Sequence, residues 1–404
     1  MDNASVNDAL ARELARLLLK RYGISFIPVN AQIHCIAHVV NLVVQQILSN
    51  ILDVDDPALA DYYELYNKHL PFHYDLADDE DLKRWEAEGK GTGGETADSD
   101  EEDETSQQDE EMDELDQELA EMLASNLRLI VKKIVSSPQR RSRFRHTAEQ
   151  VYAEATDEHV RLRSLMVVRD VVTRWNYTHA MIERALLLRK AIHRWVLDSD
   201  ESTQHLFLTV QEWELLAKIG SLLEIFTKVT KEMSRSRTPT LPYVLPMYGR
   251  MFKALDTYAR DEKISPDIRN AAAAGLRKLN EYYTVAKASQ FTLLATMLHP
   301  SLRLKWLASA YGDSYKDGYR ALFQHVYNDY ASSGLIQAQT AKPKPSQESS
   351  GDDFLREVCS IPEASDGDGF QSDAGNADAK DEVERYLRGE GSAASFHEPL
   401  QWWK

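Results

Sequence analysis

The 404-residue chain has few of the features that define several common protein classes. It contains only two cysteines, Cys35 and Cys359, whose separation argues against a disulfide framework and suits a reducing compartment. No apolar run reaches 18 residues and the N-terminal stretch carries acidic residues, so the sequence predicts neither a membrane span nor a signal peptide. With 43% apolar residues the chain can still bury a sizeable core, in two or three domains. We expect a soluble, intracellular protein.

Patterns that carry catalytic or metal chemistry are also scarce. The sequence has no glycine-rich phosphate loop and no nucleophile elbow, and its Ser, His and Asp residues show no spacing that supports a triad. Cys35 and His38 are spaced as two zinc ligands, but a zinc site needs four, or three and a water molecule. No second pair lies near them. The sequence therefore predicts no metal site.

The net charge of −18 is unevenly distributed along the chain. Between Asp75 and Glu121 there are 22 acidic residues against Lys83, Arg84 and Lys90, a local net charge of −19. The remainder of the chain therefore carries about +1. Acidity confined to one stretch does not exclude nucleic-acid binding elsewhere, and it offers a surface for basic proteins.

Hydrophobic periodicity predicts a mainly α-helical protein. Residues 1–55 suggest a small α/β segment, with helices at 5–21 and 37–52 around short β-leaning stretches at 24–29 and 32–35. The acidic run at 75–116 has too few large apolar residues to offset the entropy of ordering, so we expect it to be disordered. The further segments expected are a helical domain at 117–335, a disordered linker at 336–380 and a short terminal segment at 381–404.

The stretch from Val171 to Val196 shows the clearest helical pattern. Its apolar residues recur at steps of three and four and predict one buried face: Met181, Ala185, Leu188, Ile192 and Trp195. Trp175 stands at the start of this helix, between Arg174 and Asn176. Its simplest role is that of an apolar side chain that staples the helix start to the core.

The most basic stretch is Gln139 to His146. Arg140, Arg141, Arg143 and Arg145 surround Phe144, so the stretch offers cations for phosphate groups and a ring that could stack on a base. The alternative is that this stretch is the solvated, charged start of a helix and pairs with the acidic run at 75–116.

Five short blocks, in order along the chain, resemble those of hAT-family transposases, most closely the fungal elements. They are Asp2–Asn7 (DNASVN), Cys35–Leu42 (CIAHVVNL), Asp170–Tyr177 (DVVTRWNY), Leu298–Lys305 (LHPSLRLK) and Glu382–Lys404, which ends in PLQWWK. In the fourth block His299 replaces the usual aspartate. Each block alone is weakly specific, but the ordered set extends across almost the whole chain.

The resemblance implies an RNase H-like catalytic domain interrupted by a large helical insertion. Such enzymes hold two divalent metals, Mg²⁺ or Mn²⁺, on three carboxylates. Asp2 matches the second carboxylate, whereas the other two would lie beyond both ends of this sequence. One carboxylate cannot hold two metals, so we expect no catalysis and no cofactor. The family motif residues are Cys35, His38, Arg174, Trp175 and Asn176, and the resemblance implies a DNA-handling position for Trp175.

The expected function is that of a nuclear, transposase-derived and catalytically inactive protein. It would keep residual DNA binding through Arg140, Arg141, Arg143, Phe144 and Arg145. It would dimerise through an incomplete C-terminal region that contains Trp402 and Trp403. Two alternatives stay open: a helical scaffold that binds basic proteins through the acidic insert, and a fragment of an active transposase from an incomplete gene prediction.

Overall fold

The computed structural model describes residues 5–25, 27–28, 33–52, 79–88, 123–153, 156–170, 175–236, 238–332, 353–360, 382–389, 396 and 398–403. Every regular element in these ranges is a helix, which confirms the expected mainly α-helical fold. The chain divides into two compact units, each described by itself. Unit 1 comprises Met1–Leu42, Lys228–Asp256 and Leu276–Lys404, and unit 2 comprises Val43–Thr227 and Thr257–Gly275.

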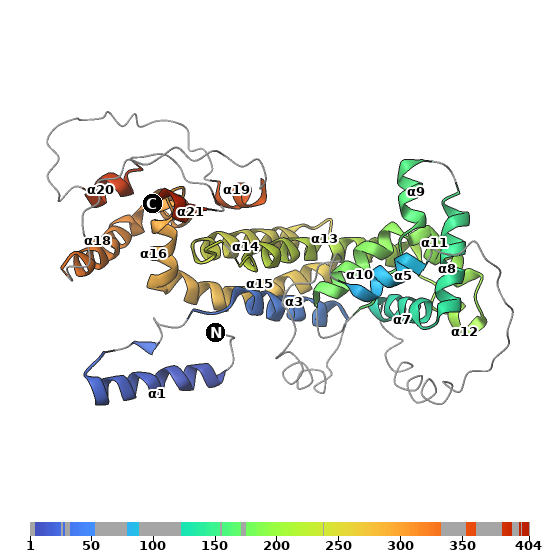
Figure 1. Ribbon diagram of the computed structural model, residues 1–404, viewed down its shortest axis with the longest axis horizontal. Helices are drawn as coiled ribbons and strands as arrows, with labels where there is room; N and C mark the ends of the chain where they lie inside the picture. The colour runs from blue at the N-terminus through green and yellow to red at the C-terminus, as the bar shows by residue number, and fades with distance from the viewer. Residues whose placement is uncertain are drawn as a thin grey trace. The chain divides into compact units, whose positions relative to one another are not determined.

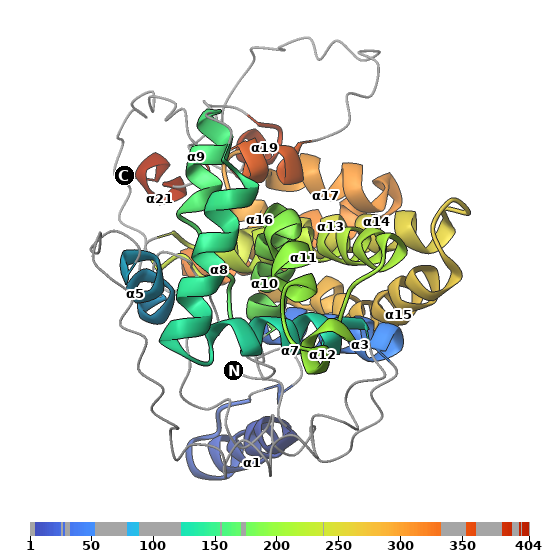
Figure 2. The ribbon, with the colours of Figure 1, turned by 90° about the vertical axis from the view of Figure 1, so that its right-hand side faces the viewer.

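Unit 2 contains helices from within and after the acidic run, together with parts of four helices that continue into unit 1. They are α5 (Glu80–Glu88), α7 (Leu123–Val135), α8 (Pro138–Val151), α9 (Asp157–Arg163), α10 (Trp175–Leu187), α11 (Arg189–Leu197), α12 (Glu201–Gln204), most of α13 (Val210–Met233), and parts of α3 (Ile36–Leu52), α14 (Val244–Arg260) and α15 (Pro266–Ala288). Helix α8 packs against both α7 and α11, as the two views show (Figures 1 and 2).

The helix predicted across 171–196 is two helices in the structure. Helix α10 ends at Leu187 and α11 begins at Arg189, because the backbone of Leu188 (φ −94°, ψ 12°) leaves the helical region. The predicted buried face is nevertheless correct, since Met181, Ala185, Leu188, Ile192 and Trp195 are all at most 2% exposed. The break at Leu188 is small, so the apolar side chains of α10 and of α11 still point toward the core.

Unit 1 contains α1 and the helices of the C-terminal half. They are α1 (Ser5–Tyr22), η4 (Leu241–Tyr243), α16 (Gln290–Leu298), α17 (Arg303–Tyr311), η5 (Asp313–Tyr315), α18 (Lys316–Ser332), α19 (Asp353–Cys359), α20 (Glu382–Leu387) and α21 (Pro399–Trp402), with the remaining parts of α3, α13, α14 and α15. Helix α16 packs against η4, α17 and α18, and α20 contacts α17 and α18.

The structure differs from the expected α/β segment at 1–55. Helices α1 and α3 form as expected, but the described residues of 24–29 and 32–35 include no strand. An isolated β-leaning stretch has no neighbouring strand to pair with among the described residues, and Pro28 lacks the N–H that a ladder requires. The RNase H-like remnant stays a prediction, because residues 26, 29 and 32 of these stretches lie outside the described residues. Within this segment, α3 buries Val39, Val40, Val43, Val44 and Ile47 completely.

The structure also departs from the expectation of disorder across 75–116. Within this stretch Glu80–Glu88 form α5, whose Leu82 and Trp85 are buried. The Asp79 carboxylate caps the helix by accepting the backbone N–H of Leu82 at 2.9 Å. Two buried apolar side chains three residues apart thus help to dock this short helix. The expectation of a disordered linker at 336–380 is likewise wrong for Asp353–Cys359, which form α19 and bury Leu355, Val358 and Cys359. The rest of the acidic run and of this linker lies mostly outside the described residues.

Candidate nucleic-acid interface

The basic stretch forms the first half of α8. Ser137 is its N-cap, with an extended backbone and a hydroxyl that accepts the N–H of Arg140 at 3.2 Å. Pro138 follows at the first helical position, where its missing N–H costs nothing. The four arginines are therefore presented from a regular helix that starts one residue before the predicted basic stretch.

Phe144 does not serve as a stacking ring in this structure. Its side chain is 0% exposed, and together with Thr147 and Ala148 it forms the buried face of α8. Phe144 lies three and four residues before Thr147 and Ala148, so all three side chains face the core. A ring buried in this way cannot stack on a base. Phe144 is therefore a core residue, and the candidate nucleic-acid contact consists of the arginines that flank it.

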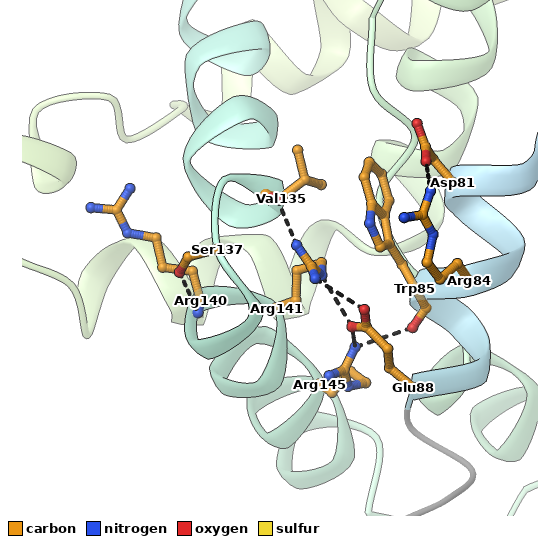
Figure 3. Close-up of polar contacts among 9 residues, drawn as sticks. All are labelled: Asp81, Arg84, Trp85, Glu88, Val135, Ser137, Arg140, Arg141 and Arg145. Carbon is orange, nitrogen blue, oxygen red and sulfur yellow. Dashed lines mark hydrogen bonds and ion pairs between the residues drawn. The ribbon is translucent and has the colours of Figure 1, made fainter. Parts of the chain in front are cut away.

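Arg141 and Arg145 hold the carboxylate of Glu88 from α5 (Figure 3). Arg141 meets Glu88 through two parallel contacts, Nη2 to Oε1 at 3.0 Å and Nε to Oε2 at 3.1 Å. Arg145 Nη1 lies 3.4 Å from the same Oε2 and also donates to the backbone carbonyl of Trp85 at 3.1 Å. These contacts match the alternative interpretation of the basic stretch, in which it pairs with the acidic insert.

Helix α5 is held by apolar and further ionic contacts. Its Trp85 ring lies under the Arg141 guanidinium, 5.6 Å from centroid to carbon. One residue on, Glu86 pairs with Arg184 of α10 at 2.7 Å and also accepts the backbone N–H of Met166 at 3.3 Å. The group formed by Trp85, Glu88, Arg141 and Arg145 is called the α5 arginine site below.

The α5 arginine site stays partly hydrated. The side chains of Arg141, Arg145 and Glu88 are 11%, 17% and 30% exposed. The hydrogen bond from Arg141 lowers the pKa of Glu88 below its ordinary value, against the opposing effect of burial. The carboxylate is therefore charged at neutral pH, and its contacts are charge-assisted.

The other two arginines of α8 are exposed. Arg140 Nη1 donates to the Ser136 hydroxyl at 3.0 Å, and Arg143 donates to the carbonyl of Asp198, at the C-terminal end of α11. Residues 123–200 carry 15 Lys and Arg against eight Asp and Glu, a net charge of +7. This basic segment directly follows the acidic run in the sequence.

The tetrad Thr173–Asn176 (TRWN) is only partly described, because Thr173 and Arg174 lie outside the described residues. Trp175 is 6% exposed and packs edge-on against Phe226 of α13, with ring centroids 6.5 Å apart. This supports the apolar-staple interpretation, and Asn176 beside it is half-buried. Sequence reasoning missed Asp170, which pairs with Arg128 of α7 and accepts the Thr178 hydroxyl at 2.9 Å.

The remaining predicted positions lie in unit 1. Asp2 is outside the described residues. Cys35 is a half-buried free thiol, and His38, one turn on, is half-buried as well. In the described part of the chain no group of three or more His, Cys, Asp or Glu side chains is arranged to hold a metal ion.

The 298–305 block and the C-terminal block meet within unit 1. His299 Nδ1 accepts the backbone N–H of Ser301 at 3.2 Å, so the proton of the neutral ring lies on Nε2, 2.8 Å from the Tyr243 hydroxyl. That hydroxyl in turn donates to the Phe396 carbonyl. His299 is 1% exposed, and burial lowers its pKa to about 4, which keeps the ring neutral.

Arg303 completes this contact. It is 4% exposed, its guanidinium lies 4.9 Å from the Tyr386 ring and 5.5 Å from the Trp402 ring, and its Nη1 donates to the Tyr386 carbonyl at 3.2 Å. Trp403 packs on Tyr386 but stays 49% exposed. The side chains of Tyr243, His299, Arg303, Tyr386 and Trp402 are called the His299 cluster below.

Comparison with known proteins finds a domain that is similar to the segment containing the basic helix. Residues 100–222 match the ZBED1 RNase-like helical domain. The matched range includes the α5 site arginines Arg141 and Arg145, and also Trp175. The match to a helical domain is consistent with the helical insertion implied by the resemblance to hAT-family transposases.

Two curated relatives extend the comparison. A Talaromyces stipitatus protein named as the transcriptional regulator tpeD is 24% identical over 186 residues, which is 46% of this chain and 18% of that protein. A Zea mays protein named as an AC transposase is 25% identical over 195 residues, 46% of this chain and 23% of that protein. The chain spans about a fifth of the length of these relatives. No solved structure matches it significantly. These matches support a transposase-related, hAT-like origin.

Proposed function

We propose that this chain is a transposase-derived nuclear protein that binds DNA through α8. The observation that carries the proposal is the row of arginines on this helix, in a segment with a net charge of +7. Arg140 and Arg143 are exposed, and α8 falls within the range related to the ZBED1 helical domain. Guanidinium groups at a helix surface bind backbone phosphates in a way that depends little on base sequence. The relatives named as a transposase and a transcriptional regulator support the same interpretation and a nuclear location.

Fluorescence anisotropy with a labelled DNA duplex tests this proposal. The double variant Arg140→Ala/Arg143→Ala should bind about tenfold more weakly at low salt, because it removes two phosphate contacts. The slope of log affinity against log salt should also fall by about two. The control is Lys218→Ala/Lys263→Ala, which removes the same charge from exposed positions on and after other helices of unit 2. Equal affinities for the two double variants, or no binding by the unaltered chain at low salt, would contradict the proposal.

The alternative function is a scaffold that recruits basic proteins through the acidic run. The contacts of α5 count against this use for Glu86 and Glu88, because both already pair with arginines of the same chain. The other acidic residues of the run could still serve. Deleting residues 89–121 should abolish the capture of histones if this alternative holds, whereas unchanged capture would count against it.

Two further expectations remain proposals. We infer that the chain by itself does not cleave DNA; a strand-cleavage assay with Mg²⁺ or Mn²⁺ tests this, and cleavage would contradict it. A homodimer contact through Trp402 and Trp403 would use the exposed face of Trp403. Sedimentation of the unaltered chain and of Trp403→Ala at matched concentrations tests this contact, and an unchanged mass would count against it.

A further inference from the structure

The Glu88 carboxylate occupies a set of donors that would also hold a phosphate group. Arg141 donates one N–H to each oxygen of the Glu88 carboxylate, and Arg145 adds a third N–H to Oε2. A planar, two-pronged contact of this kind suits carboxylate and phosphate equally, because both present two oxygens in one plane. Arg141 and Arg145 lie on the same helix as Arg140 and Arg143, the exposed residues of the proposed DNA contact.

Helix α5 has the properties of a displaceable element. It has nine residues, too few to be stable as an isolated helix in water, so its order depends on docking. Only Leu82 and Trp85 are buried, and the ion pairs around them are partly hydrated. The carboxylates of Glu86 and Glu88 are 27% and 30% exposed, so salt screens these ion pairs from the acidic side and a polyanion can compete for the arginines.

The charges on each side favour this competition. Helix α5 carries Glu80, Asp81, Glu86 and Glu88 against Lys83 and Arg84, and it lies in the stretch 75–121, whose net charge is −19. A DNA backbone is a denser line of negative charge than this helix. The two anions would use the same guanidinium groups and cannot occupy them together.

We propose that α5 is an intramolecular competitor of DNA, in which Glu88 takes the place of a backbone phosphate on Arg141 and Arg145. Bound DNA then displaces α5, and docked α5 reduces the affinity for DNA. This inference rests on the proposed function, because it assigns a regulatory element to the same arginine surface.

The experiment compares two variants of the full chain that change the charge equally. Glu88→Gln weakens the carboxylate contact to both arginines. Glu80→Gln removes the same charge from an exposed position of the same helix. In anisotropy titrations with a DNA duplex, Glu88→Gln should bind about three- to fivefold more tightly than the unaltered chain. Glu80→Gln should stay within about twofold.

Hydrogen exchange gives a second readout that does not depend on affinity. Adding the duplex to the unaltered chain should accelerate exchange at Glu80–Glu88, because displaced α5 loses its helix. Trp85→Ala should produce the same acceleration without DNA, and circular dichroism would check that the remaining helices persist.

The outcomes separate the two proposals. Tight binding by the unaltered chain with equal affinities for Glu88→Gln and Glu80→Gln would overturn the competition and leave the DNA contact standing. Slow exchange at α5 in the DNA complex would overturn it as well. No binding by any variant at low salt would overturn the proposed function instead, and the competition with it.

Discussion

The α5 arginine site in unit 2 and the His299 cluster in unit 1 both join segments that are distant in the sequence. In the first, a charged carboxylate and two arginines meet while keeping part of their contact with water. In the second, a neutral histidine, a tyrosine hydroxyl and a backbone carbonyl form a buried chain of hydrogen bonds, and Arg303 stacks on aromatic rings.

The difference lies in what each contact loses when it opens. The Glu88 carboxylate is 30% exposed and recovers water on separation, so opening this contact costs less than opening a fully buried one. Buried polar atoms that lose their partners pay the full cost of desolvation. The His299 cluster should therefore act as a permanent part of unit 1, and the α5 arginine site as an exchangeable contact.

Acidification should expose this difference most strongly. Burial lowers the pKa of His299 to about 4 from an ordinary value of 6.5. The unfolded chain takes up a proton as the pH falls through 6.5, but the folded chain resists it until about 4. Stability is thus fully present above pH 6.5 and is lost as the pH falls towards 4, by about 3 kcal/mol. Protonation would also place a hydrogen on Nδ1, opposite the N–H of Ser301.

Denaturant unfolding at several pH values measures this loss, with His299→Asn as the reference. Asparagine keeps an acceptor near the Nδ1 position but does not titrate, so the variant should be less stable at neutral pH and lose less on acidification. Because His179 is also buried with a lowered pKa in both proteins, the difference between them isolates His299. Parallel stability curves for the two proteins would show that the His299 ring is not buried and neutral.

Local periodicity explains which part of this architecture could be predicted from the sequence. The buried face of α10 and α11 follows from apolar steps of three and four, and the break at Leu188 left that spacing intact. Helix α5 could not be predicted from composition, because the average over the charged residues 75–116 hides the two apolar side chains of this short helix. The signal was present: Asp79 as an N-cap, with Leu82 and Trp85 three residues apart.

The two contacts themselves could not be predicted from the sequence, because they depend on packing over long distances in the chain. Glu88 and Arg141 are 53 residues apart, and Tyr243 and Phe396 are 153 residues apart. The sequence allows the basic stretch to pair with the acidic residues of 75–121. Nothing in the sequence, however, selects Glu88 from these 22 acidic residues. Likewise, Phe144 fits both a core and a stacking role until the direction of α8 is known.

The stacked guanidinium in the His299 cluster should give the next largest effect. Arg303→Lys keeps the charge but loses the guanidinium contact over the Tyr386 and Trp402 rings, and it should lower the free energy of unfolding by about 1–2 kcal/mol. The control is Arg320→Lys in the same unit, whose ion pair with Glu384 is half-exposed, with an expected loss below about 0.5 kcal/mol. Equal losses in urea unfolding would mean that Arg303 acts as an ordinary surface charge.

The smallest effect on stability should come from the α5 arginine site. Glu88→Gln keeps the shape of the side chain and an amide oxygen that the arginines can still meet, so it should lower the free energy of unfolding by less than about 1 kcal/mol. Added salt should narrow the gap between this variant and the unaltered chain, because the partly hydrated pair is screened. The same added salt should leave two effects in the His299 cluster unchanged: the loss of stability at low pH and the loss caused by Arg303→Lys. If Glu88→Gln instead lowers stability as much as Arg303→Lys, at low and at high salt, then α5 is a structural part of unit 2. In that case DNA could not displace α5 at a cost compatible with binding.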